Sequence, residues 1–202
     1  VKVFLKDAPV YETDYRKAVT FALSKIPAHL LSNITSIHIG VFEMLITREV
    51  QAVYEGGKIF LTNSHESVYD ALDDIIHEVA HSVEEVYTKE IYEDNTIKRE
   101  FLEKRKKMWQ RLKDRGFEKE LSFFIEMKYN KEFDKFLYKE VGYPVLRMIT
   151  SDVFYSPYAA TSLREYFANS FEAFFMREEV QRLKKISPAA FEKNVILLNM
   201  EE

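Results

Sequence analysis

The chain contains no cysteine among its 202 residues. Disulfide scaffolds, thiolate nucleophiles, zinc fingers and iron–sulfur clusters are therefore excluded, and any metal site must use histidine, aspartate or glutamate. Only five glycines and five prolines are present, too few for a long flexible linker. No apolar run approaches the roughly 20 residues that a membrane helix needs. The formal net charge of −4 gives no general attraction for nucleic acid.

The chain length is that of one domain, or of one domain carrying an insertion. Hydrophobic residues make up 47% and charged residues 31% of the chain, the balance of a globular protein with a substantial core. We expect a single domain over residues 1–202 of the α+β class, dominated by helices. Its expected parts are a small mixed sheet with a long helix in 1–89, a charged helical insertion in 90–141, and further helices in 142–202.

Alternation of apolar and polar residues predicts the strands of the first part. The pattern covers Val1–Leu5 and residues 36–41, and each stretch is typical of a short, half-buried strand. Residues 50–54 and 58–62 flank Glu55-Gly56-Gly57, which is a hairpin signal because glycine adopts positive φ at little cost. After this hairpin the hydrophobic spacing becomes that of helices.

The sequence His77-Glu78-Val79-Ala80-His81 lies within a long helical pattern that Ser67 can cap. Histidines four residues apart lie on one face of a helix, so both imidazoles can bind one ion. Zinc–nitrogen bonds are about 2.0–2.1 Å long and require such a convergence. Glu78 then lies beside the metal, where a carboxylate can take a proton from metal-bound water. Two ordinary histidines on an amphipathic helix remain the alternative interpretation of these five residues.

The third ligand of such a site must be a carboxylate. No histidine follows His81, and the position six residues further on is Tyr87. Glu84 and Glu85 lie one turn further along the same helix, too far to close a compact tetrahedral site. A carboxylate from a separate helix is therefore required.

Glu165 is the candidate that the sequence favours. It forms a polar line with Asn169 and Glu172 on a helix that is otherwise rich in phenylalanine. A polar stripe facing an apolar core needs a partner, and a metal centre is one. Ser162 three residues earlier also makes a capping box with Glu165, in which the carboxylate would bond the Ser162 backbone. Both interpretations stay open from sequence.

Tyr158 stands seven residues before Glu165, and residues 165–171 read Glu-Tyr-Phe-Ala-Asn-Ser-Phe. This segment resembles the Y-x6-E-F-F-A-E-x-F segment of anthrax-lethal-factor-like zinc metallopeptidases, a group that includes the Pro-Pro endopeptidases. The resemblance covers two patches, 75–83 and 158–171, and more loosely Pro-Ala-Ala-Phe at 188–191. The paired second motif is much more specific than H-E-x-x-H alone.

The resemblance implies a zincin-like fold with a gluzincin-type site that holds one Zn²⁺ per chain. It assigns zinc binding to His77, His81 and Glu165, the role of general base to Glu78, and stabilisation of the oxyanion to Tyr158. The expected activity is zinc-dependent hydrolysis of peptide bonds by an endopeptidase acting on a protein or peptide substrate.

One departure from the family segment concerns the surroundings of the ligands. Asn169 replaces an acid that would hold a ligand histidine, so either zinc affinity falls or another acid, Glu172 or Glu85, takes its place. The alternative function is therefore a catalytically impaired zincin-fold protein that acts as a binding or interaction module.

Substrate and partners are predicted less directly. An extended peptide needs a sheet edge, and our candidate is the strand Lys58, Ile59, Phe60, Leu61 and Thr62; an internal strand fits its pattern equally well. Acidic residues interleave the basic run Lys104–Lys107, so we expect a solvated helix face and no nucleic-acid partner. We expect a soluble protein, secreted by analogy with the family, or cytosolic if Val1 is the true start. The oligomeric state is not predicted.

Overall fold

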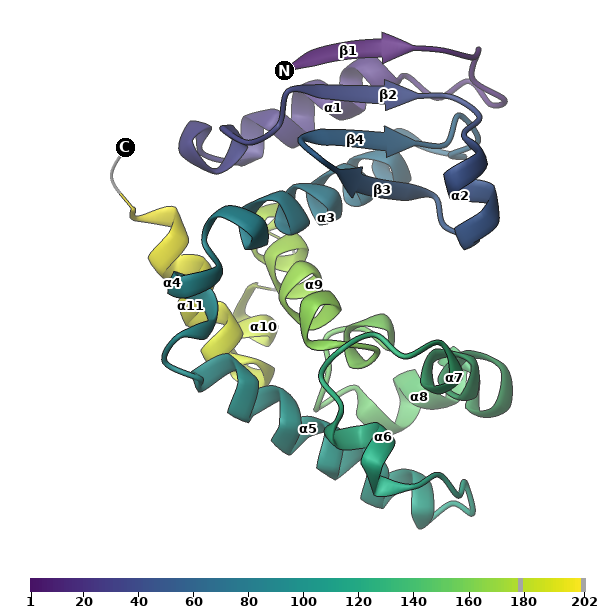
Figure 1. The fold of residues 1–202 in the computed structure, drawn as a ribbon, viewed down its shortest axis with the longest axis vertical. Helices are drawn as coiled ribbons and strands as arrows, with labels where there is room; N and C mark the ends of the chain where they lie inside the picture. Colours follow the sequence, from purple (N-terminus) through teal and green to yellow (C-terminus); the bar gives the residue numbers. More distant parts are fainter. Residues whose placement is uncertain (178–179, 201–202) are drawn as a thin grey trace. The chain divides into compact units, whose positions relative to one another are not determined.

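The computed structural model describes residues 1–177 and 180–200 (Figure 1). The chain divides into two compact units, one formed by residues 1–88 with Met200 and the other by residues 89–199. Helices dominate both the chain and the second unit, and the strands form one small mixed sheet. The predicted α+β, helix-dominated class is confirmed. The zincin-like fold and the single domain stay predictions.

The first unit contains a four-stranded sheet of order β1-β2-β4-β3. Its first two strand pairs are parallel and its last pair is antiparallel. Gly56 and Gly57 join the antiparallel pair with φ of 54° and 77°, the left-handed conformation that a two-residue hairpin turn requires. The strands are β1 (Lys2–Leu5), β2 (Ser36–Ile39), β3 (Ala52–Glu55) and β4 (Lys58–Leu61).

The order of the sheet corrects the expectation that Lys58–Thr62 is a free edge for a peptide. Strand β4 pairs with β2 on one side and with β3 on the other, and Ile59 and Leu61 are completely buried. The edges of the sheet are β1 and β3. Alternation predicts that the hairpin strands pair with each other, but it does not tell which of them the earlier strand β2 joins.

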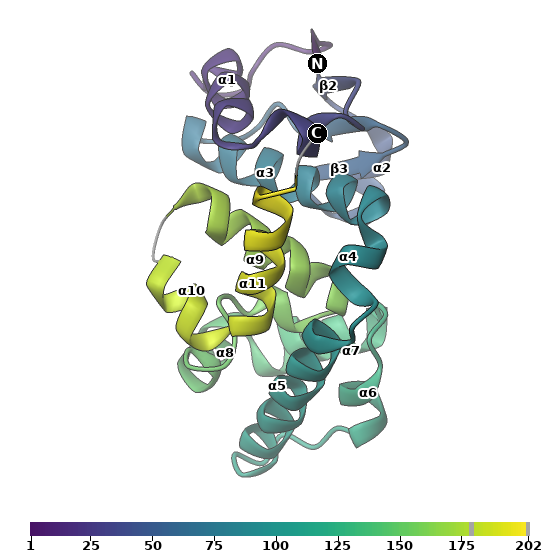
Figure 2. The same ribbon diagram turned by 90° about the vertical axis from the view of Figure 1, so that its left-hand side faces the viewer.

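Two helices of the first unit lie along one face of the sheet (Figures 1 and 2). They are α1 (Tyr15–Lys25) and α3 (Val68–Val86), and they pack against each other. As predicted, Ser67 caps α3, because its Oγ accepts a hydrogen bond from the Asp70 backbone N–H at 3.1 Å. The unit also contains the short helix α2 (Glu43–Arg48) and the 3₁₀ turn η1 (Ala28–Leu31), which we did not predict.

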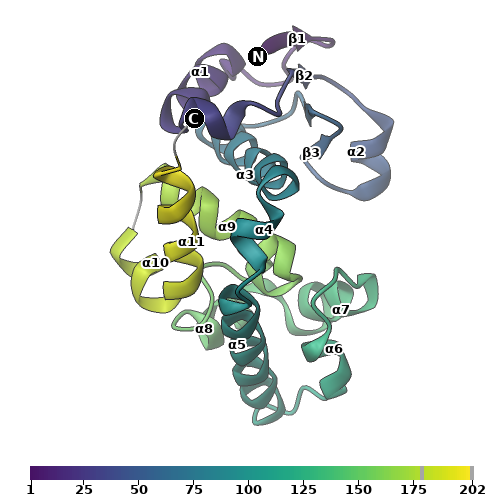
Figure 3. The ribbon, with the colours of Figure 1, turned by 60° about the vertical axis from the view of Figure 1, so that its left-hand side comes forward.

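The second unit is built around helices α5, α9 and α11, which contact one another; Figure 3 shows α11 beside α9 and α10. The stretch expected as an insertion supplies α5, so it takes part in the core of this unit. The elements after residue 87 are α4 (Thr88–Tyr92), α5 (Thr96–Lys113), α6 (Leu121–Ile125), α7 (Lys131–Lys135), the π-helix η2 (Phe136–Val141), α8 (Tyr143–Thr150), the 3₁₀ turn η3 (Tyr158–Ala160), α9 (Leu163–Met176), α10 (Val180–Ile186) and α11 (Pro188–Leu198).

Helix α5 buries two of the four cations that we expected on a solvated face. Lys104 and Arg105 are 8% and 1% exposed, whereas Lys106 and Lys107 are exposed. The expectation is wrong for the first two, because they follow the buried Phe101 by three and four residues and so share its face of the helix. Burial lowers the pKa of Lys104 to about 8, although the Glu100 carboxylate acts in the opposite direction.

A half-buried carboxylate on α5 connects three helices. Glu100 accepts hydrogen bonds from the backbone N–H groups of Ala189 at 2.8 Å and Ala190 at 3.1 Å, and from the Tyr166 hydroxyl at 2.6 Å. A carboxylate at a helix N-terminus satisfies amides that have no partner within the helix and interacts favourably with its dipole. Glu100 therefore fixes the start of α11 against α5 and α9.

We expect Glu100→Ala to lower the free energy of unfolding by about 2–3 kcal/mol, because the buried Tyr166 hydroxyl and two helix-end amides lose a charged acceptor. Urea unfolding followed by circular dichroism measures the change. The matched control is Glu103→Ala on the same helix, an exposed position where we expect at most about 0.5 kcal/mol. Equal losses in the two variants would show that Glu100 does not hold the helices together.

Candidate metal centre

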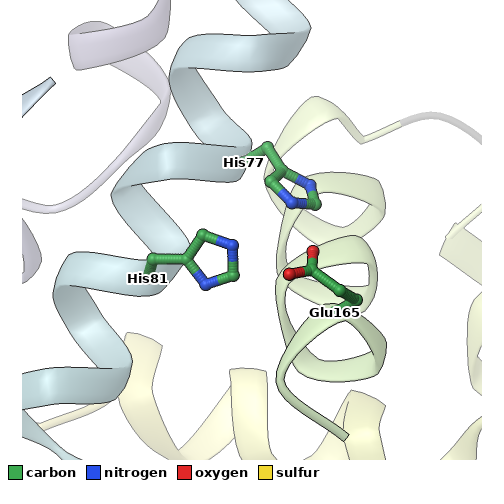
Figure 4. Close-up of side chains that lie close together, drawn as sticks. All are labelled: His77, His81 and Glu165. Carbon is green, nitrogen blue, oxygen red and sulfur yellow. The ribbon is translucent and has the colours of Figure 1, made fainter. Parts of the chain in front are cut away.

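The structure brings together two histidines and one glutamate that could hold a metal ion. One ligand atom from each of His77, His81 and Glu165 lies within 4.8 Å of the other two. Figure 4 shows both imidazoles and the carboxylate pointing toward a common point. Two imidazole nitrogens and one carboxylate oxygen are a donor set that zinc uses in catalytic sites, where a fourth position stays open for water. The donors therefore fit zinc, and other divalent cations use the same ligands.

Helix α3 holds the two imidazoles in fixed relation. Their ring centroids are 5.0 Å apart and the ring planes are nearly perpendicular, at 82°. Around them Ile76, Val79 and Ala80 are completely buried, so the helix cannot rotate without exposing its core. The spacing of four residues gives the shared face, and the buried stripe keeps that face in place.

A carboxylate on the same helix contacts one of the imidazoles. Glu84 Oε2 lies 3.6 Å from His81 Nδ1. Glu85, which the sequence offers as another acid near the ligands, accepts a hydrogen bond from the Tyr54 hydroxyl at 2.7 Å; its role beside a ligand histidine stays a prediction. The sequence cannot distinguish these neighbouring acids, because the choice depends on a strand residue 31 positions away. A carboxylate on the free nitrogen of a ligand histidine fixes the orientation of the ring.

Glu78 is buried, with 7% of its surface exposed, and it is bound to the edge of the sheet. Its Oε2 accepts a hydrogen bond from the Tyr54 backbone N–H at 2.5 Å. Tyr54 lies in β3, so this N–H points outward from the edge strand. The residue assigned as general base thus has one oxygen anchored, which sequence reasoning did not foresee.

The start of α9 resolves how Glu165 can take part in a cap and still face the histidines. Ser162 Oγ accepts a hydrogen bond from the Glu165 backbone N–H at 3.1 Å, so Ser162 is the N-cap. The Glu165 carboxylate is the part of the residue that joins the group with His77 and His81. The cap bond seen here uses the Glu165 backbone N–H, whereas the capping box would use the carboxylate, so this cap does not compete with the histidines for the carboxylate.

Asn169 and Glu172 follow Glu165 along α9. Asn169 is 5% exposed, and its Oδ1 has no hydrogen-bond partner among the described residues. Such buried, unsatisfied acceptors are uncommon and call for a water, an ion or another donor. Glu172 is half-buried. The buried amide one turn from Glu165 is an acceptor for a donor that the protein chain itself does not supply.

Tyr158 is the first residue of the turn η3 and is half-buried. Its carbonyl accepts hydrogen bonds from the Thr161 backbone N–H at 3.0 Å and from the Thr161 hydroxyl at 2.8 Å. These bonds hold the turn that leads into α9. They fix the backbone of Tyr158, and its assignment as oxyanion donor stays a prediction.

Two further tyrosines lie within the electrostatic influence of Glu165, and sequence reasoning missed both. Tyr129 is 54% exposed; partial desolvation and a hydrogen bond to Asp134 at 2.9 Å raise its pKa to about 12, with a smaller contribution from Glu165. Burial also raises the pKa of Tyr143, and the Asp134 and Glu165 charges act in the same direction. Both phenols stay protonated at neutral pH. The only sequence signal was the break at Gly142-Tyr143-Pro144.

Comparisons with family models, with curated proteins and with solved structures find no match to this chain. The likeness to anthrax-lethal-factor-like metallopeptidases therefore rests on the two sequence motifs. Within the described residues, none of the helices has both the length and the apolar character needed to cross a membrane.

We expect the purified chain to bind about one zinc per molecule, as a single site requires. His77→Ala and Glu165→Gln remove ligands, so their zinc affinity should fall by more than the roughly 10–100-fold that loss of an outer contact costs. Competition with a chromophoric chelator measures the affinities.

The control for this experiment is His38→Ala, which removes an imidazole that stacks between Phe4 and Phe60 on the sheet. It should bind zinc as tightly as the wild type. Wild-type affinity in His77→Ala or in Glu165→Gln would exclude that residue as a ligand.

Proposed function

We propose that the protein is a zinc-dependent endopeptidase that hydrolyses peptide bonds with a metal-activated water. The observation that carries the proposal is the grouping of His77, His81 and Glu165, next in sequence to a buried, anchored carboxylate, Glu78. Bound zinc supplies a Lewis acid and a water whose pKa falls from 15.7 to roughly 7. The other parts of the reaction belong to the protein's own residues.

Glu78 has the surroundings of a general base. The Tyr54 N–H holds its Oε2, and we assign to this fixed carboxylate the acceptance of a proton from the attacking water and its delivery to the leaving amine. A fixed carboxylate of this kind contributes about 10²–10⁴-fold to the rate. The anchor lies on the backbone, so it does not depend on the identity of the side chain at position 54.

Strand β3 is the edge on which we place the substrate. It replaces β4, which has no free edge, and its residue Tyr54 contacts Glu78 directly. An extended peptide that adds to a sheet edge gains main-chain hydrogen bonds and presents its own carbonyls in a regular row. The scissile bond would then lie beside the general base. Specificity for particular side chains is not part of the proposal.

Tyr158 is proposed as the donor to the tetrahedral oxyanion, supported by its spacing from Glu165 and by the family resemblance. Turn η3 and the N-terminus of α9 are adjacent in sequence and packed together. A donor aimed at the developing charge lowers the barrier because it needs no reorganisation during the reaction.

A second candidate function follows from Asn169. The buried amide occupies the position of an acid in the family segment, and its Oδ1 is unsatisfied. If this change weakens the hold on the ligands, the protein is a zincin-fold binding module with little or no hydrolysis. Glu84 beside His81 supports the enzyme, because an acid of this chain already contacts one proposed ligand.

We expect Glu78→Gln to keep its zinc and to lose about 10²–10⁴-fold in peptide hydrolysis, because an amide cannot accept the proton. Cleavage of a diverse peptide library, read by mass spectrometry with and without a chelator, gives the rate. Glu85→Gln, on the same helix, is the control and should stay active. A zinc-loaded wild type that cleaves no peptide would favour the binding module, and an active Glu78→Gln would exclude the assigned base.

Tyr158→Phe should retain zinc and lose about 10²–10³-fold in kcat, the usual cost of one oxyanion donor. Tyr155→Phe, three residues earlier, serves as the control with unchanged kcat. Steady-state kinetics on one cleaved library peptide separates kcat from KM. Unchanged turnover in Tyr158→Phe would exclude Tyr158 as the oxyanion donor. The next candidates would be Tyr129 and Tyr143, the phenols influenced by the charge of Glu165.

A further inference from the structure

Arg105 on α5 is the most deeply buried cation among the described residues, with 1% of its surface exposed. One amino group of its guanidinium donates hydrogen bonds to the carbonyls of Ala160 and Thr161, the latter at 3.2 Å. The other donates to the carbonyls of Phe123 and Glu126, the latter at 3.2 Å. The guanidinium thus joins two backbone segments that are far apart in sequence.

Arg105 has aromatic neighbours, and none of the carboxylates that the structure describes is bonded to it. Its guanidinium carbon lies 4.1 Å from the centroid of the Phe133 ring and 5.2 Å from that of Phe101, distances at which cation–π attraction operates. Burial lowers its pKa to about 9. A buried charge costs free energy unless hydrogen bonds compensate it, and here backbone carbonyls bond both amino groups, while the buried Nε has no partner among the described residues.

The two carbonyls of the first pair belong to the segment that joins Tyr158 to Glu165. Ala160 ends the turn η3, and Thr161 directly precedes the Ser162 cap of α9. The Leu163 backbone N–H, one residue further on, donates to the Met127 carbonyl at 2.9 Å. Residues 160–163 are therefore connected to residues 123–127 directly by the Leu163–Met127 hydrogen bond and indirectly through Arg105, which donates to both segments.

The adjacent cation shows that burial alone does not produce this connection. Lys104 donates to the carbonyls of Val153 and Ile186 and, at 3.3 Å, to Ser187 Oγ. None of these acceptors lies between Tyr158 and Glu165. Two neighbouring buried cations on one helix thus fix different parts of the same unit, and only Arg105 reaches the segment that carries the proposed ligand.

We propose that Arg105 is a positioning residue of the hydrolytic site, holding the backbone between Tyr158 and Glu165 so that the phenol and the carboxylate keep a fixed spacing. The inference rests on the proposed function, because the spacing between the phenol and the carboxylate matters only if both take part in hydrolysis. Arg105 acts through the backbone and touches neither substrate nor metal.

The shape of the guanidinium is what this role requires. Its planar fork presents donors in two directions, whereas a lysine ammonium is a point charge on a flexible stem. Lysine at position 105 keeps a buried cation but cannot serve both carbonyl pairs at once. The Arg105→Lys variant therefore keeps the buried charge and removes the link between the two backbone segments, so it tests the link alone.

The experiment compares Arg105→Lys and Arg105→Gln with Lys104→Met, the matched loss of a buried cation one residue away. For each folded variant we measure zinc affinity by chelator competition, the visible spectrum of the cobalt-substituted protein, thermal stability, and kcat and KM on a cleaved peptide. Both Arg105 variants should bind zinc about 10-fold more weakly and lose about 100-fold in kcat. KM should change little.

Lys104→Met should lose thermal stability while its zinc affinity, cobalt spectrum and kcat stay at wild-type values. The inference is overturned if the Arg105 variants match Lys104→Met in zinc affinity and kcat, since Arg105 then only stabilises the fold. Should neither Arg105 variant fold, Phe133→Leu removes the ring beneath the guanidinium and is measured instead, with the same direction expected and the same wild-type result overturning the inference.

The outcomes keep the two proposals apart. A wild type that binds no zinc refutes the proposed function on its own, whatever the Arg105 variants do. A wild type that binds zinc and cleaves peptide, together with Arg105 variants that do both equally well, leaves the endopeptidase standing and refutes the positioning role.

Discussion

The spacing of two imidazoles on one buried helix is the constraint on which the candidate site depends. Four residues separate His77 from His81, and the residues around them leave α3 no freedom to turn. The helix also begins at a defined cap, Ser67. Everything else in the site is an addition to this rigid pair: a carboxylate from α9, a second carboxylate held by the edge strand, and an acid beside one imidazole.

Three charged side chains on α5 follow one physical rule. Glu100 bonds two backbone amides, Lys104 bonds two carbonyls, and Arg105 bonds four. Each of these side chains on α5 thus compensates its burial mainly with backbone groups at the ends of other elements. Burying these charges costs desolvation free energy. The contacts are specific in geometry, because a backbone group at a turn or helix end has one fixed position. Helix α5 has the composition of a surface helix, yet its charged side chains hold the ends of other elements in place.

The sequence predicted those features that depend on local spacing. Ser67 and Ser162 were identified as caps, H-E-x-x-H as a shared helix face, and Glu165 as the carboxylate that joins it. Each follows from the geometry of one helix and from the need to satisfy polar groups. The glycine pair of the β3–β4 hairpin was predicted on the same basis.

Features that depend on distant partners were not predictable. The central position of β4 depends on where β2 docks, and the choice between Glu84 and Glu85 depends on the hydroxyl of Tyr54. Lys104 and Arg105 looked like surface residues because their carbonyl acceptors lie between 18 and 82 residues away. A single sequence shows which side chains are polar, but not which backbone groups will meet them.

The bond between Glu78 and the Tyr54 amide has a further consequence for any chain that extends the sheet. The Tyr54 N–H on the free edge of β3 already donates to the Glu78 side chain. An added strand therefore cannot accept from it, and the row of backbone hydrogen bonds has a gap at that level. Its own carbonyl opposite the gap stays without a backbone partner.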